Sequence, residues 1–154
     1  TAALGTALRA LGHDQDVFVI QFLKTEDSGE IAPLRKLGAQ VECFGTGNFV
    51  DPKAITEEDR KQARKALLRA EQIIKCGTYE VVILDEINIA LDFGLLKLEL
   101  VLDLLNNVSD DVHVLITGRS CPEELMELAD LVTEMKKIKH PFDREIPPQQ
   151  GLEF

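Results

Sequence analysis

The stretch Val81-Val82-Ile83-Leu84-Asp85-Glu86-Ile87-Asn88 changes abruptly from an apolar run to a pair of acids. Its first four residues are apolar and mostly β-branched, which predicts a short strand that is buried on both faces. We therefore expect Asp85 and Glu86 at the carboxyl end of that strand, the edge at which ligands bind in an open α/β sheet. Adjacent carboxylates there suit a magnesium ion beside a phosphate chain. Alternatively, the two acids only cap the next helix, because acidic side chains favour helix N-termini.

Other apolar runs alternate with amphipathic stretches on both sides of this strand. Further strands are expected over residues 17–23, 40–44, 112–116 and 131–135. Helices are expected over residues 1–12, 30–37, 56–76, 87–91, 96–107 and 122–130, and Thr56 is a suitable N-cap for the longest of them. This alternation predicts βαβ units, a mostly parallel sheet and helices on both of its faces. The expected fold class is therefore α/β with three layers.

Composition narrows the class of protein. The 154 residues are enough for one domain with a substantial core. A net charge of −10 argues against a mainly electrostatic partner such as nucleic acid or a membrane surface. No apolar run approaches the roughly 20 residues of a membrane span. Three widely separated cysteines, Cys43, Cys76 and Cys121, form neither a CxxC metal site nor a disulfide framework, which favours a cytoplasmic protein.

Polar side chains lie at the carboxyl ends of three of the predicted strands. They are Gln21 and Lys24, then Asp85 and Glu86, then Thr117 and Arg119. If these strands are parallel neighbours, their carboxyl ends share one edge of the sheet. Acids for a metal ion, a hydroxyl group and two cations for phosphate are the groups that a nucleotide site requires.

Such a site normally includes a glycine-rich loop whose amides hold the phosphates, ending in Lys-Thr at the start of a helix. The pattern G-x-x-x-x-G-K-[ST] does not occur in the 154 residues. The Ala-rich helix expected over residues 1–12 is the element to which such a loop leads. We therefore expect that the loop belongs immediately before Thr1.

Seven segments, taken in order, carry a resemblance to a known family. They are Thr1–Ala10 with Gly12 and His13, Val19–Lys24, Val81–Leu91, Leu115–Arg119, Ala129–Glu134, Lys139–Phe142 and Gln150–Phe154. Their order and spacing resemble the P-loop type ATP:corrinoid adenosyltransferases, which act on cob(I)yrinic acid a,c-diamide or cob(I)alamin. The resemblance covers essentially the whole chain. It implies a single domain over residues 1–154 with a P-loop NTPase (RecA-like) architecture, whose N-terminal segment and GKGKT-type P-loop precede Thr1.

The resemblance also implies a reaction. The cobalt(I) of a reduced corrinoid attacks the 5′ carbon of ATP, an adenosyl–cobalt bond forms and triphosphate leaves, as in adenosylcobalamin biosynthesis. No water has to be activated, so catalysis depends on positioning and on stabilising the departing triphosphate. The implied ligands are ATP, Mg²⁺ or Mn²⁺ and the corrinoid. The implied partners are an electron-donor protein such as a flavodoxin and a second copy of the chain in a homodimer, in the cytoplasm, with no nucleic acid or membrane.

The same resemblance implies which residues form the site. Glu86, with Asp85 beside it, is expected to bind the metal ion. Arg119 is expected to neutralise the leaving triphosphate, although a surface arginine that caps a helix is the alternative. Contacts to the nucleotide are assigned to Thr1, Arg9, Gln21, Lys24, Thr117 and Gly118.

The loop that follows the strand expected over residues 40–44 is expected to contact the corrinoid. Some family members carry Phe and Trp there, to shield the lower face of the corrinoid. This chain has no Trp, and its loop offers Phe49 and Val50 as an apolar wall. The alternative is that both side chains belong to the core.

Two other functions are compatible with the Asp85–Glu86 pair. One is an ordinary P-loop ATPase or nucleotide kinase, which leaves the matching C-terminal segments unexplained. The other is a nucleotide-binding module without turnover.

Overall fold

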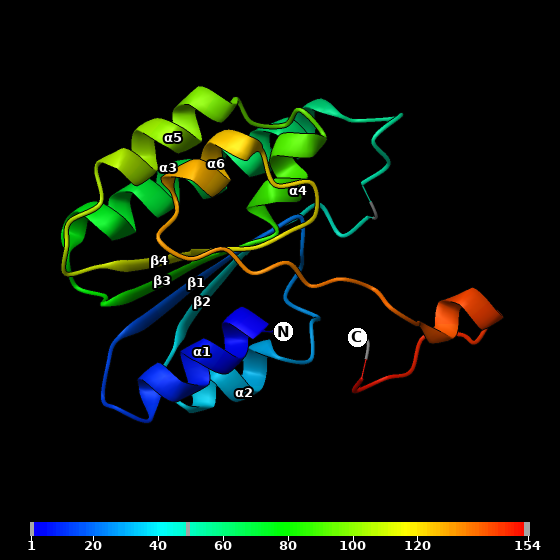
Figure 1. Cartoon of the computed structure of the whole chain (residues 1–154), viewed down its shortest axis with the longest axis horizontal. Coiled ribbons are helices and arrows are strands. Elements are labelled where there is room, and N and C mark those ends of the chain that lie inside the picture. Colours follow the sequence, from blue (N-terminus) through cyan, green and yellow to red (C-terminus); the bar gives the residue numbers. More distant parts are fainter. Residues whose placement is uncertain (1, 49, 153–154) are drawn as a thin grey trace. The chain divides into compact units, whose positions relative to one another are not determined.

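The computed structural model describes residues 2–48 and 50–152 and divides into two compact units, Thr1–Pro122 and Glu123–Phe154. The first unit is built on a parallel sheet of four strands in the order β2-β1-β3-β4 (Figure 1). Its strands are β1 (Val17–Phe22), β2 (Gln40–Phe44), β3 (Val81–Asp85) and β4 (His113–Ile116). Every residue of β1 and β3 is buried. The prediction of an α/β fold with a parallel sheet is confirmed.

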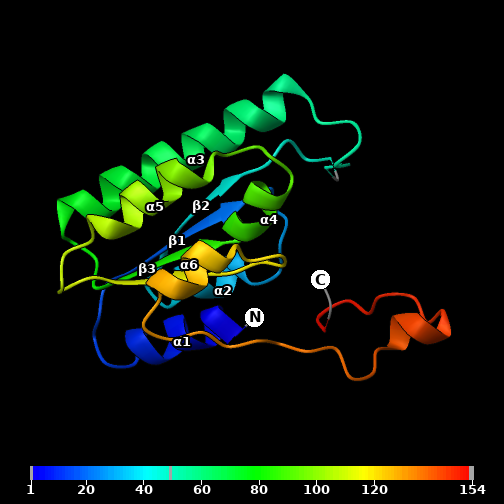
Figure 2. The ribbon, with the colours of Figure 1, turned by 45° about the horizontal axis from the view of Figure 1, so that its top comes forward.

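Helices cover both faces of this sheet. They are α1 (Ala2–Leu11), α2 (Ile31–Lys36), α3 (Glu57–Cys76), α4 (Ile87–Asp92) and α5 (Leu98–Asn106). Figures 1 and 2 show α1 and α2 on one face and α3, α4 and α5 on the other. This three-layer arrangement is consistent with a P-loop NTPase-like architecture.

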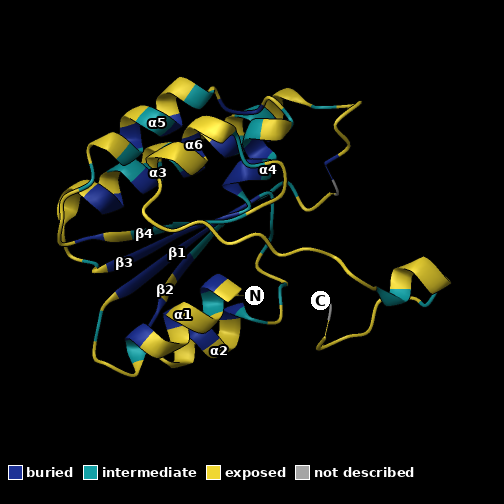
Figure 3. Ribbon diagram, viewed as in Figure 1, coloured by how far each residue is buried: buried dark blue, intermediate teal, exposed yellow. Residues whose placement is uncertain are grey.

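The two faces of the sheet are filled in different ways. Alanines of α1, among them Ala3 and Ala7, pack with Val17 and Val19 of β1, and their small side chains let the helix approach the strand closely. On the other face α3 contributes Ala63, Ala66, Ala70, Ile73 and Ile74, all buried. Figure 3 shows that burial is concentrated in the strands and on the helix sides that face them. The hydrophobic effect therefore fixes the layers.

The longest helix begins as its sequence predicts. The Thr56 hydroxyl accepts a hydrogen bond from the Asp59 backbone N–H, and the Asp59 carboxylate accepts one from the Thr56 backbone N–H. This capping box satisfies two donors that would otherwise lack partners. Gly77, in the left-handed conformation, follows the helix.

The second unit contains α6 (Glu123–Leu128) and a short 3₁₀ helix, η1 (Pro141–Arg144). The strand predicted over residues 131–135 is wrong, because these residues have no regular structure and Leu131 and Met135 are 84% and 79% exposed. An apolar run forms a strand only where a neighbouring strand satisfies its backbone groups. Among the described residues, no helix is long and apolar enough to cross a membrane.

Candidate active site

The register of the strands brings the predicted polar residues to one edge of the sheet. Gln21 of β1 lies opposite Asp85 of β3, and Leu84 lies opposite Ile116 of β4. Thr117 directly follows that last pair, and its N–H donates to the carbonyl oxygen of Leu84. The expectation that these strands are parallel neighbours and share a carboxyl edge is therefore confirmed.

Asp85 is at the centre of a hydrogen-bond network. Its side chain is 5% exposed, and Oδ2 accepts from Lys24 Nζ at 2.9 Å and from Gln21 Nε2 at 3.2 Å. Oδ1 accepts from the Thr117 hydroxyl at 2.8 Å. Burial opposes ionisation, but these donors and the charge of Lys24 outweigh it and hold the pKa of Asp85 below its usual value. Asp85 is therefore a buried carboxylate whose negative charge is stabilised by three side-chain hydrogen-bond donors.

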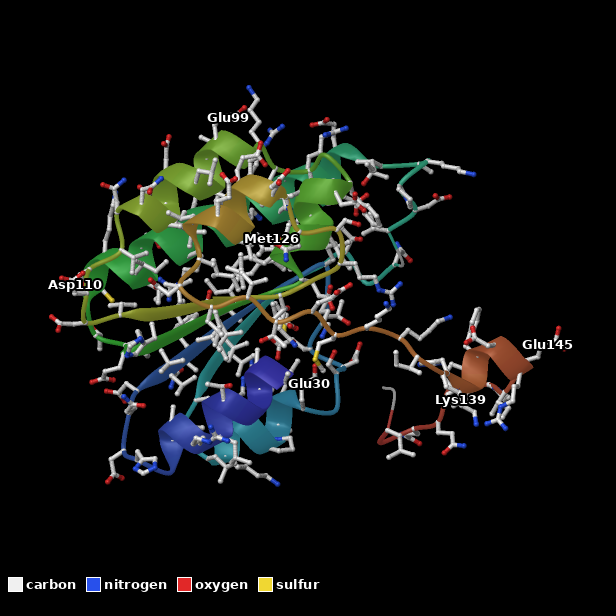
Figure 4. The ribbon with its side chains drawn as sticks, viewed as in Figure 1. Glu30, Glu99, Asp110, Met126, Lys139 and Glu145 are labelled. Carbon is white, nitrogen blue, oxygen red and sulfur yellow. The ribbon has the colours of Figure 1, made fainter. Side chains whose placement is uncertain are left out.

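Glu30 joins this network although its sequence gave no indication of a role. Its Oε1 accepts from Gln21 Nε2 at 3.0 Å and from Lys24 Nζ at 3.4 Å. Figure 4 labels Glu30, which lies just before the first residue of α2. The signal that could have found it is position, because the loop between β1 and α2 leaves the sheet at its carboxyl edge.

Glu86 has an unusual backbone and a carboxylate oxygen without a partner. Its φ of 66° is left-handed, and its N–H donates to the Thr117 hydroxyl at 3.0 Å. Glu86 occupies the N-cap position of α4, but its side chain makes no capping hydrogen bond to the helix. Oε2 is buried and has no hydrogen-bond partner among the residues that the structure describes. A buried anionic oxygen of this kind requires a cation or a donor beyond the residues that the structure describes.

Electrostatics at Glu86 support the same conclusion. Burial, and next the charge of Asp85, raise the pKa of Glu86, whereas the charges of Lys24 and Arg119 oppose the increase. A divalent cation beside Glu86 would offset both of the unfavourable contributions. The described residues contain no group of three or more His, Cys, Asp or Glu side chains placed to hold a metal ion, so the remaining ligands would come from water and phosphate oxygens.

Gly118 brings two loops of the carboxyl edge into contact. Its φ is 131°, and a Cβ atom there would lie 2.8 Å from Cβ of Asn88. The backbone N–H of Asn88 donates to the carbonyl oxygen of Thr117 at 3.2 Å. The absence of a side chain at Gly118 therefore allows the loop after β4 to lie against the start of α4.

Other predicted site residues lie apart from this network. Arg9 lines a cavity of about 220 Å³ together with Val81 and His113, the first residues of β3 and β4, and so lies at the opposite edge of the sheet. Arg119 is exposed, but its charge acts on Glu86. The remaining predictions concern the loop after β2 and the first residue of the chain.

Val50 of that loop is 8% exposed, which agrees with the core alternative for its side chain. Thr1 and Phe49 lie outside the described residues. Their assignments to the nucleotide and to the corrinoid stay predictions from the resemblance.

Comparison with known proteins identifies the family. The sequence model of the family described as ATP:corrinoid adenosyltransferase BtuR/CobO/CobP matches residues 1–154. The corrinoid adenosyltransferase of Escherichia coli (strain K12) is 36% identical over 155 residues, which cover 100% of this chain and 79% of that protein. The corrinoid adenosyltransferase CobA of Salmonella typhimurium is 34% identical with the same coverage. The corrinoid adenosyltransferase of Pseudomonas aeruginosa is 36% identical over 156 residues, which cover 100% of this chain and 77% of that protein. This chain belongs to the ATP:corrinoid adenosyltransferase family.

Proposed function

We propose that this chain transfers the 5′-deoxyadenosyl group of ATP to a cobalt(I) corrinoid and that the carboxyl edge of β1, β3 and β4 holds the triphosphate of ATP. Membership of the family supports the reaction. The buried, unpartnered Oε2 of Glu86 carries the assignment of the site, because it marks where a cation is needed. Asp85 and Lys24 beside it provide the charges that a triphosphate site contains.

The reaction is a displacement at carbon. The corrinoid cobalt donates an electron pair to C5′ of ATP, the cobalt–carbon bond forms, the C5′–O bond breaks and triphosphate takes the bonding pair. No proton has to be removed from the nucleophile, so the chain needs no general base. Its side chains act by orienting ATP with C5′ toward the corrinoid and by stabilising the charge of the leaving triphosphate.

The residues of the edge have distinct roles in this proposal. Glu86 binds Mg²⁺ or Mn²⁺ directly, because within the described part of the chain its Oε2 has no other partner. The bound metal ion supplies positive charge to the triphosphate oxygens. Thr117 holds the Glu86 backbone and the Asp85 carboxylate in register. Arg119, whose charge acts on Glu86, contacts the departing triphosphate.

The resemblance supports three further proposals about partners and location. A second copy of the chain forms a homodimer with it. A reducing protein such as a flavodoxin supplies the electron that converts cobalt(II) to cobalt(I). The protein works in the cytoplasm, where a biosynthetic enzyme of this family is expected.

The test uses the full-length protein with ATP, Mg²⁺ and cob(I)alamin under a strong reductant, and follows the absorbance change on adenosylation together with triphosphate release. Glu86→Gln should lose most of the activity because one carboxylate charge is removed from the metal. Glu99→Gln is the control, since Glu99 is an exposed acid of α5 (Figure 4). Full activity of Glu86→Gln at limiting Mg²⁺ would remove Glu86 from the metal site. Release of ADP and phosphate without a corrinoid would indicate an ATPase instead.

A further inference from the structure

Two carboxylates share the same two donors at the carboxyl edge. Gln21 Nε2 donates to Asp85 Oδ2 at 3.2 Å and to Glu30 Oε1 at 3.0 Å. Lys24 Nζ lies 2.9 Å from the same Asp85 oxygen and 3.4 Å from the same Glu30 oxygen. The ammonium group of Lys24 is therefore bound at Asp85 but already within reach of Glu30.

The net charge of the side chains around Lys24 favours the binding of a divalent cation. Asp85, Glu86 and Glu30 contribute three negative charges and Lys24 one positive charge, so the four side chains together carry −2. The charges of all three acids act on Lys24: burial opposes its charged form, but the hydrogen bond to Asp85 and these charges hold its pKa above the usual value. A divalent cation would make the four side chains and the ion neutral together.

An ammonium group on Asp85 and a metal ion at the adjacent Glu86 repel each other, because two positive charges at a distance of a few ångströms in a partly buried site interact strongly. Lys24 is the group that can move, since its side chain is flexible and 32% exposed. Gln21 is 0% exposed, and its Oε1 accepts a hydrogen bond from the Cys43 thiol at 3.4 Å. The Gln21 amide therefore stays between the two carboxylates while Lys24 changes partner.

We propose that Lys24 is a resident counter-ion of Asp85, that a divalent cation bound at Glu86 displaces it, and that Glu30 is the positioning residue that then holds its ammonium group. This inference rests on the proposed function, because it takes Glu86 as the metal ligand. It assigns a role to Glu30, which is the second carboxylate within reach of Lys24 Nζ.

The first test measures the affinity of the full-length protein for Mn²⁺ alone, from the spin-resonance signal of free Mn²⁺. Lys24→Met removes the competing ammonium group, so it should bind Mn²⁺ about tenfold more tightly than the native protein. Unchanged or weaker binding would overturn the displacement of Lys24. Glu86→Gln tests the proposed function separately: if it binds Mn²⁺ like the native protein, Glu86 is not the ligand and the proposed site fails.

The second test isolates Glu30. Glu30→Gln should weaken Mn²⁺ binding, because Lys24 then has no partner to receive it and stays on Asp85. In the Lys24→Met background, Glu30→Gln should have only a small effect on Mn²⁺ binding, no larger than that of Glu26→Gln. Glu26→Gln is the matched control, because Glu26 lies in the same loop as Glu30 but is paired with Arg35. An equal loss in both backgrounds would show that Glu30 acts only through its charge, which overturns its positioning role.

Thermal unfolding gives a readout that does not depend on turnover. Without metal, Lys24→Met leaves the Asp85 carboxylate without its cation and should unfold at a lower temperature than the native protein. Saturating Mn²⁺ should raise its melting temperature by more than it raises that of the native protein. An equal increase in both would contradict the exchange. If Lys24→Met does not fold, Lys24→Gln keeps a neutral donor for Asp85 and is measured in the same way.

Discussion

The Thr117 hydroxyl donates a hydrogen bond of 2.8 Å to Oδ1 of Asp85, which ties the end of β4 to the end of β3. The same hydroxyl oxygen accepts from the backbone N–H of Glu86, the residue that turns the chain from β3 into α4. A single side chain thus fixes the orientation of one acid and the backbone of the next. Substitutions of Thr117 therefore test how the two acids are positioned without changing the charge of the site.

Thr117→Val should reduce both stability and adenosyl transfer. The substitution keeps the shape of the side chain but leaves the Glu86 N–H and one Asp85 lone pair unsatisfied, at a cost of about 1–3 kcal/mol. Urea unfolding measures the first effect and the corrinoid assay the second. Thr117→Ser keeps the hydroxyl and should remain close to the native protein in both. Native activity in the valine variant would show that Thr117 does not position the acids.

Two neighbouring acids should respond in opposite directions to removal of their charge. Glu86→Gln removes a buried, unpartnered anionic oxygen, so in the absence of metal the free energy of unfolding should stay equal or increase. Asp85→Asn breaks a buried ion pair with Lys24 and should lower it by about 2 kcal/mol or more. Urea denaturation of the metal-free variants tests the contrast. A large loss of stability in Glu86→Gln would mean that its carboxylate has a partner.

Gly118→Ala should be far more destabilising than Gly94→Ala. Both glycines have positive φ, 131° at Gly118 and 64° at Gly94. The left-handed backbone costs an alanine roughly 1–2 kcal/mol at Gly94, and the backbone of Gly118 is at least as unfavourable for a side chain. At Gly118 the new Cβ would also lie 2.8 Å from the Asn88 Cβ, whereas nothing lies within 4 Å of it at Gly94. Overpacking adds about 1–3 kcal/mol. Equal free energies of unfolding for the two variants would show that the loop after β4 is not held against α4.

The cysteines should differ in their reactivity with alkylating reagents. Burial, and next the charge of Glu26, raise the pKa of Cys43 to about 11, so little thiolate is present at pH 8. A hydrogen bond from Thr78 lowers the pKa of Cys76, which is exposed. Iodoacetamide at pH 8 should therefore modify Cys76 much faster than Cys43, as peptide mass spectrometry can measure.

The pH dependence of the same reaction provides a second check. Because the thiolate is the nucleophile, the rate at Cys43 should increase about tenfold per pH unit between pH 8 and 10. The rate at Cys76 should level off at a lower pH. A rate at Cys43 that is independent of pH over this range would contradict its burial.

Local patterns in the sequence were sufficient for most elements of the first unit. Apolar runs predicted the four strands of the parallel sheet, and Thr56 as an N-cap predicted the start of α3. The same reasoning was wrong for residues 131–135, where an apolar run has no strand beside it. Periodicity reports only how one segment would bury its side chains, and whether a partner segment is available is a property of the whole fold.

The sequence by itself determined that five polar residues lie at the carboxyl ends of strands, namely Gln21, Lys24, Asp85, Glu86 and Thr117. Its family resemblance implied the reaction. Tertiary structure decided the contacts among these residues. Lys24 and Asp85 are 61 residues apart, and they meet because β1 and β3 are neighbours in the sheet. It also placed Glu30 beside both of them and Arg9 at the opposite edge. Patterns along the chain predict the element to which each residue belongs. The distance between residues of different elements depends on strand order and register, and these arise only when the hydrophobic faces pack.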